Sequence, residues 1–237
     1  MHGSDSRRGD LPKWLWLFAP FVILVVQVAA RSGSDETYWK WMRSEVSVPE
    51  LGTVFWLVLA IVAVLALLVR NTRGAPTWYT AFLACFAAGA IYFCGEEASW
   101  GQHYLHWNTP EAWAAVNDQK ETNLHNISAL LDQFPRLMLT LAALVGGVVV
   151  PIARSKRPAL FRPGTLLERL GPTYVCMPAA LLALTIRLPQ NLCNALELEL
   201  PHVLDMQPGE FVEYFLGMFL AMYALSMWHR RSAATVS

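Results

Sequence analysis

Apolar residues gather along this chain in six long blocks, each 16 to 19 residues in length and separated from the next by polar residues. A hydrocarbon core about 30 Å thick is crossed by roughly 17 to 25 apolar helical residues, so each block predicts one transmembrane helix. The blocks are residues 14–30, 51–69, 77–95, 137–153, 173–188 and 211–228. The sequence therefore predicts an all-α fold, a polytopic membrane bundle of about six transmembrane helices that forms one domain over residues 1–237.

The first block also fits a second interpretation. Arg7, Arg8 and Lys13 precede it, and Val28-Ala29-Ala30 is a passable cleavage site, as in a secretory signal that is removed from the mature protein. Its apolar run is longer than the usual core of a signal, which favours a retained span.

Composition agrees with the membrane assignment. The chain is 55% hydrophobic and 15% charged, whereas an average soluble domain carries about 25% charged residues. The net charge of zero gives no basic surface for nucleic acid, so no nucleic-acid partner is expected. The four cysteines lack metal-ligand spacing, which excludes a zinc ribbon, although Cys94 and Cys193 could pair in an oxidising compartment.

Charge is distributed unequally between the two sides that six spans define. The segments on the side of the amino terminus hold 12 of the 18 basic residues and three of the 18 acidic ones, for a charge of +9 against −9 on the opposite side. By the positive-inside rule, both termini are expected in the cytoplasm, and the short loops favour the inner membrane of a bacterium. Residues 31–50, 96–135 and 190–210 then face outward.

The outward segments 96–135 and 190–210 contain most of the chain's candidate chemistry, including His103, His106, His125 and His202. The third span enters the first of them without a turn signal, so its helix is expected to continue as far as His103. Glu96, Ser99 and His103 would then share one helix face, and Glu97 would point elsewhere. The alternative is that the two glutamates simply reach water at the end of a span.

A second outward helix is predicted over residues 117–134, where polar and apolar residues recur three and four apart. It would lie at the membrane interface with its polar stripe facing the protein interior or water. Glu121 and His125, four residues apart, could bind one metal ion or transfer a proton, with His125 packed against Glu96 and His103. The alternative is a solvated polar face. The polar stripe comprises Asp118, Glu121, His125, Ser128 and Asp132.

Glu213 lies inside the apolar block of the sixth span, where an ionisable group is costly and is by default a functional candidate. We expect it to face the bundle, with a partner among Glu96, Glu97 and His125. The alternative is a glutamate that reaches water from the first helical turn, where the helix dipole favours a negative charge.

Two strings carry a resemblance to known proteins. Gly95-Glu96-Glu97-Ala98-Ser99-Trp100-Gly101-Gln102 and Glu121-Thr122-Asn123-Leu124-His125-Asn126 look like strings in a group of uncharacterised bacterial multi-span proteins, a likeness that implies no activity. Ser99-Trp100 with His103, and Leu130-Leu131-Asp132 followed by Pro135, resemble motifs of the alkaline ceramidase group of membrane hydrolases. That likeness implies a serine, an aspartate and three histidines around zinc.

This chain departs from the ceramidase group in two ways. That group has seven spans, and its paired histidines on the last helix have no counterpart in residues 211–228, so His202 or His125 would have to substitute. The likeness nevertheless gives catalytic roles to Ser99 and Asp132.

Three functions follow from these residues. The first is a metal-assisted enzyme, a hydrolase or transferase, that acts on a lipid or lipid-linked substrate, with a divalent metal such as zinc activating water. The others are a structural or assembly subunit that docks partner membrane proteins, and a proton- or cation-coupled transporter. The expected metal ligands are Glu96, His103, Glu121, His125 and His202, and the expected catalytic residues are Glu97, Ser99, Asp132 and Glu213.

Overall fold

A computed structural model of the chain describes residues 10–42, 47–70, 76–117, 120–124 and 126–234. Within these ranges the fold is helical and contains no β-strand. Six helical segments are long and apolar enough to cross a membrane, which confirms the predicted bundle of six spans. They are Trp14–Arg31, Val48–Arg70, Thr77–Glu97, Leu130–Lys156, Leu166–Ala195 and His202–Arg231.

Four of the six spans in the described residues are built from several helical pieces. The first joins a π-helical turn, η2 (Trp14–Phe18), to α1 (Ala19–Arg31), while α3 (Val48–Arg70) and α4 (Thr77–Glu97) are continuous. The fourth comprises α7 (Ala129–Ala142), the π-helical η4 (Ala143–Val149) and α8 (Val150–Lys156). The fifth comprises α9 (Leu166–Leu170), η6 (Tyr174–Cys176), α10 (Met177–Thr185) and α11 (Leu188–Ala195), and the sixth comprises η7 (His202–Leu204) and α12 (Pro208–Ala234).

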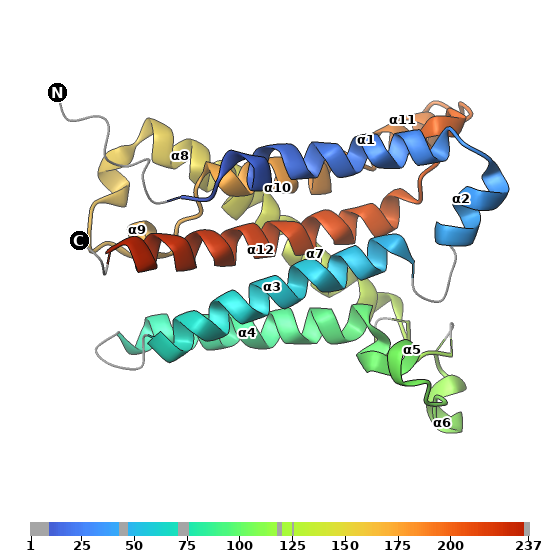
Figure 1. The fold of residues 1–237 in the computed structure, drawn as a ribbon, viewed down its shortest axis with the longest axis horizontal. Coiled ribbons are helices and arrows are strands. Elements are labelled where there is room, and N and C mark those ends of the chain that lie inside the picture. Colours follow the sequence, from blue (N-terminus) through green and yellow to red (C-terminus); the bar gives the residue numbers. More distant parts are fainter. Residues whose placement is uncertain (1–9, 43–46, 71–75, 118–119, 125, 235–237) are drawn as a thin grey trace.

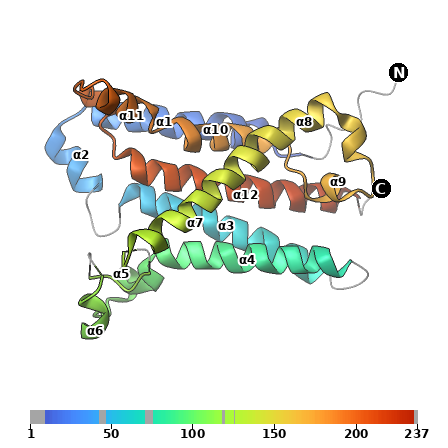
Figure 2. The ribbon, with the colours of Figure 1, turned by 180° about the vertical axis from the view of Figure 1, so that it is seen from behind.

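The short connecting helices and the ends of the spans gather at the two ends of the bundle. Figure 1 shows α2 (Asp35–Met42), α5 (Gln102–Leu105), α6 (Glu111–Ala114) and α11 at one end, and α8, α9 and the end of α12 at the other. Figure 2 shows α7 running obliquely to α12 and α4. The segments predicted to share one side of the membrane therefore lie at one end of the bundle, here called the acidic end.

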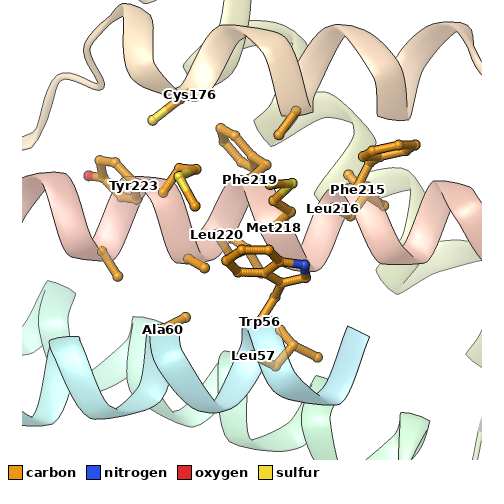
Figure 3. Packing of buried hydrophobic residues seen from close by; sticks show 14 of the residues in the cluster. Trp56, Leu57, Ala60, Cys176, Phe215, Leu216, Met218, Phe219, Leu220 and Tyr223 are labelled. Atoms are coloured by element: carbon orange, nitrogen blue, oxygen red, sulfur yellow. The ribbon is translucent and has the colours of Figure 1, made fainter. Parts of the chain in front are cut away.

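The last helix is the centre of the fold. In the most apolar stretch of the sixth span, 83% of the residues are buried inside the protein, whereas in the corresponding stretch of α4 22% are buried. Its most extensive contacts are with α3 and then with α10. Figure 3 shows Trp56 and Leu57 of α3 on one side of the row formed by Phe215, Met218 and Phe219. Peripheral helices expose Val25, Val62 and Phe134 instead, as side chains facing lipid would be.

Small residues let the helices approach one another closely. A Cβ atom added at Gly52 would lie 2.3 Å from the ring of Tyr214, and one added at Gly147 would lie 2.2 Å from the Cβ of Ala180. Without a hydrophobic driving force between helices in lipid, such close van der Waals contact is what holds spans together. The glycines in α3 and η4 are therefore positions where α12 and α10 dock.

Candidate functional site

At the acidic end the chain leaves α4 through an unusual turn. Ser99, Trp100 and Gly101 of η3 (Ser99–Gly101) have backbone φ angles of 42°, 53° and 94°, so three consecutive residues are left-handed. Two of them are not glycine, and such conformations cost free energy that surrounding contacts must offset. The Trp100 ring packs over Gly95, where a Cβ would lie 2.8 Å from it, and its indole N–H donates to Glu96 Oε1 at 2.8 Å.

Glu121 is the centre of a hydrogen-bond network that joins the two sequence strings. Its Oε2 accepts from Ser99 Oγ at 2.7 Å and from Asn123 Nδ2 at 2.7 Å, and its Oε1 lies 3.0 Å from His103 Nε2. Ser99 and Asn123 are buried. The carboxylate thus stands between the serine and the histidine, so this is not an arrangement in which the histidine contacts the serine hydroxyl directly.

Further bonds tie the segment 120–124 to the end of α4. The backbone N–H of Leu124 donates to Glu96 Oε2 at 2.6 Å, and that of Thr122 donates to Gln102 Oε1 at 2.7 Å. Both carboxylate oxygens of Glu96 thus accept hydrogen bonds from the protein, from the Trp100 indole and from the Leu124 backbone. Glu96 thereby holds the backbone of the neighbouring segment.

Two buried asparagines complete this arrangement, which we call the latch (residues 96–103, 117 and 120–124). Asn117 Nδ2 donates to the backbone oxygen and to Oδ1 of Asn123, both at 2.9 Å, while Asn117 Oδ1 accepts from the backbone N–H of Glu121 at 3.0 Å. The sequence interpretation assigned no role to these asparagines or to Gln102. The sequence pointed to them only through their position: Gln102 and Asn123 lie in the two strings, and Asn117 precedes the second string by a few residues.

The latch corrects two predicted helices. The helix expected to run from the third span to His103 ends at Glu97, and the reversal at Ser99 follows. The helix predicted over residues 117–134 begins only at Ala129, because Ser128 caps it by accepting from the Leu131 N–H at 3.3 Å. The described residues between 117 and 128 are non-helical, so the polar stripe predicted there does not form, and His125 lies outside the described residues.

A cavity of about 290 Å³ lies beside the latch, among α4, α7 and α12. Apolar side chains form most of its wall, including those of Phe86, Leu131 and Leu139. Its polar residues come from the acidic ends of all three helices and are Glu96, Glu97, Asp132, Arg136 and Glu213. Glu96 belongs to both the cavity wall and the latch, so it joins the two features.

Arg136 binds two of the cavity's carboxylates. Its Nη2 lies 2.9 Å from Asp132 Oδ1 and also donates to Glu213 Oε1. Glu213 faces the bundle, as expected from its apolar flanks, and forms an ion pair with Arg136, which was not among the partners expected from the sequence; His125, one of those expected partners, lies outside the described residues. Glu97 lines the same cavity and makes no hydrogen bond within the described part of the chain.

His202 belongs to a different contact. Its Nε2 lies 2.7 Å from Asp35 Oδ1 in α2, and Arg31 bonds the same oxygen. The Arg31 hydrogen bond, followed by that of His202, holds the pKa of Asp35 below its usual range. In the described structure His202 thus contacts α2, and its place among metal ligands stays a prediction.

The described residues do not present a metal site. No three His, Cys, Asp or Glu side chains among them are grouped so that they could hold a metal ion. Among the described residues, the expected ligands His103 and Glu121 contact each other, and both Glu121 oxygens already have protein partners. The zinc prediction thus depends on His125, outside the described residues. The cysteines in the described structure are free, with no bridge between Cys94 and Cys193.

Comparison of the chain with protein-family models, with curated proteins and with solved structures finds no match.

Proposed function

We propose that this chain is an integral membrane protein that binds a lipid or lipid-linked substrate in the cavity among α4, α7 and α12 and acts chemically on its polar head. The cavity carries this proposal, because it is apolar along most of its wall and ionisable at one end. A lipid has the same division between an apolar chain and a polar head group. The volume of about 290 Å³ is at the lower end of small-molecule sites, so the cavity suits a head group with the first part of a chain.

The position of the cavity supports entry from the lipid. α4 and α7 form its two sides without packing extensively on each other, and α12 forms its back. Leu131 and Met138 on α7 line it and are 38% and 53% exposed. A substrate could therefore pass between α4 and α7 without leaving the bilayer.

Charge at the polar end favours a particular head group. Among the described residues, four carboxylates line the cavity, and the one basic residue that does so is Arg136. Arg136 is held by Asp132 and Glu213, which leaves Glu97 as the carboxyl group without a hydrogen bond in the described chain. A positively charged or hydroxyl-bearing head group would be attracted there.

Glu97 is the residue that we assign to the reaction. A carboxyl group within reach of a bound head group can give or take a proton. Glu96 cannot do so freely, because both of its oxygens accept hydrogen bonds from the latch. The latch, including Ser99, His103 and Glu121, then positions the end of α4 that carries Glu97. By the positive-inside rule this site faces away from the cytoplasm of a bacterial inner membrane.

Native mass spectrometry of the detergent-purified protein tests the binding step. Gly89 lines the cavity, and a Cβ there meets nothing within 4 Å, so Gly89→Phe should fill the cavity without straining the helix. We expect this variant to lose the co-purified lipid. Ala88→Phe is the matched control, because Ala88 is exposed on the same helix and does not line the cavity. Equal lipid occupancy in both variants would exclude the cavity as the binding site.

The chemical step needs a separate measurement. Wild-type protein incubated with an extract of total membrane lipids should change the mass of one lipid class over time. Glu97→Gln keeps the size of the side chain and should retain lipid binding while losing that conversion. Binding without any conversion by the wild type would overturn the enzymatic part of the proposal and leave a lipid-binding subunit.

A further inference from the structure

A second cavity lies at the end of the bundle that carries the termini, here called the basic end. Its volume is about 870 Å³, and it is bounded by α8, η5 (Pro158–Phe161), η6, the end of α12 and the residue Asp10 before the first span. Figure 1 shows these elements at the end opposite α5 and α6. The cavity is thus separate from the proposed substrate site.

Two guanidinium groups converge in this cavity. Arg154 Nη2 donates to the backbone oxygen of Gly171 at 2.9 Å, and Arg230 Nη2 lies 3.5 Å from the same oxygen. Lys156 lines the cavity as a third cation. Neither arginine forms a salt bridge within the described part of the chain, so the repulsion between them is not offset by a carboxylate in direct contact.

The carboxylate that faces this cavity is already engaged. Asp10 accepts from Thr173 Oγ1 at 2.6 Å, from Ser226 Oγ at 2.9 Å and from its neighbour's backbone N–H. Glu168 meets both arginines only through its backbone oxygen. With three cations and one carboxylate in its lining, the cavity is positively charged.

One arginine atom has no acceptor. Arg154 Nε is buried and makes no hydrogen bond in the described chain, although buried donors in proteins are nearly always paired. Its guanidinium is held 4.6 Å from the centre of the Phe161 ring, which also lines the cavity. A fixed, planar group with an unused N–H is suited to an anion with several oxygens.

Much of the remaining wall is apolar. Ile152, Phe161 and Met177 line the cavity beside the cations, at the ends of the fourth and fifth spans. A charged head at the membrane boundary next to an apolar wall has the form of an anionic lipid, and basic pockets between helices on the cytoplasmic side bind such heads. We propose that this cavity binds the phosphate group of an anionic phospholipid. The proposal is independent of the function assigned to the acidic end.

The test is a titration of the full-length, detergent-purified chain with dioctanoyl phosphatidylglycerol, followed by native mass spectrometry. Dioctanoyl phosphatidylcholine and inorganic phosphate form the other two arms. Arg230→Gln is the main variant, because the hydrogen bonds of Arg230 are all 3.4 Å or longer and its loss should leave the fold intact. Lys156→Gln is a second variant. Arg162→Gln is the matched control, since Arg162 is exposed at the same end and does not line the cavity.

We expect phosphatidylglycerol to bind at least tenfold more tightly than phosphatidylcholine, and the Arg230→Gln and Lys156→Gln variants to reduce that affinity at least tenfold. The Arg162→Gln variant should bind as the wild type does. Unchanged affinity in both cavity variants, or an equal loss in the control, would overturn the site. Inorganic phosphate binding as tightly as the lipid, with the same dependence on Arg230, would overturn the lipid as its source.

Discussion

Asn123 tests whether the latch holds the segment 120–124 against the end of α4. Its amide donates to Glu121 and Ser99, and its side-chain oxygen accepts from Asn117, all within 3.1 Å. The Asn123→Ala variant removes these three hydrogen bonds from a residue that is 1% exposed.

The expected cost can be estimated from those contacts. A neutral hydrogen bond contributes about 1 kcal/mol and one to a charged group about 1.5 to 3 kcal/mol. Asn117 keeps one bond in the variant, to the backbone oxygen of residue 123. Because Asn117 still has that partner, its lost bond counts for less than a full one, and we take the charged bond at the low end of its range. Local opening should then become easier by about 3 kcal/mol, which is roughly a 100-fold rise in the open population, at 1.4 kcal/mol for each factor of ten.

Hydrogen exchange measures this opening directly. The backbone N–H groups of Glu121, Thr122 and Leu124 each donate to a side chain of the latch. Their exchange depends on local opening, so a peptide containing residues 121–124 should exchange about 100-fold faster in the Asn123→Ala variant.

The matched control is Asn108→Ala, an exposed asparagine in the same connection. It should leave that exchange rate unchanged, and peptides from α12 should remain protected in both variants. An increase of less than about threefold in Asn123→Ala would refute the latch as the structure that fixes this segment.

Two further outcomes follow from packing and from charge. Gly147→Ala should lower the melting temperature by about 5 °C, because the added Cβ would lie 2.2 Å from that of Ala180 and overpacking costs about 1–3 kcal/mol. Gly89→Ala should leave the melting temperature unchanged, because a Cβ there meets nothing within 4 Å. Equal melting temperatures of the two variants would contradict the close approach of η4 to α10. Because the Arg31 hydrogen bond lowers the pKa of Asp35 in the folded state, this contact stabilises the protein fully above the ordinary aspartate pKa of 3.8 and is lost as the pH falls through the lowered pKa. The melting temperature of Asp35→Asn should thus lie below that of the wild type at pH 5, and the gap should narrow as the pH falls below 3.8; a gap that does not narrow would refute the assignment.

The spans were predictable because, in a membrane, whether a segment forms a spanning helix depends mainly on the apolar residues of that segment itself. A backbone in lipid must satisfy its own hydrogen bonds, so an apolar run of sufficient length is helical whatever its neighbours are. All six predicted blocks lie within or largely within observed spans, although the helices extend further into polar sequence, as α4 does to Glu97. The central position of α12 was not predictable, since hydropathy does not distinguish a span buried in protein from one facing lipid.

The connection after α4 was predicted wrongly for a physical reason. Residues spaced three and four apart permit a helix, but asparagine, serine and glutamate side chains can bond backbone groups and so compete with it. Here Asn117 and Glu96 accept from backbone N–H groups that a helix would have used. Ser128 offered a signal for the true start of α7, because serine is a preferred N-cap and Asp132 falls in the first turn.

The partner of Glu213 illustrates what a sequence alone does not supply. An intramembrane carboxylate predicts a counter-ion, and Arg136 is one of the basic residues on the side of the membrane where Glu213 lies. Arg136 is 77 residues away in sequence and is also four residues from Asp132, so local spacing points to the helical pair. The contact with Glu213 exists because α7 crosses α12 obliquely, and that crossing brings three ionisable groups to one end of an apolar cavity. The candidate site is therefore a consequence of helix packing, whereas the residues that form it were visible one by one in the sequence.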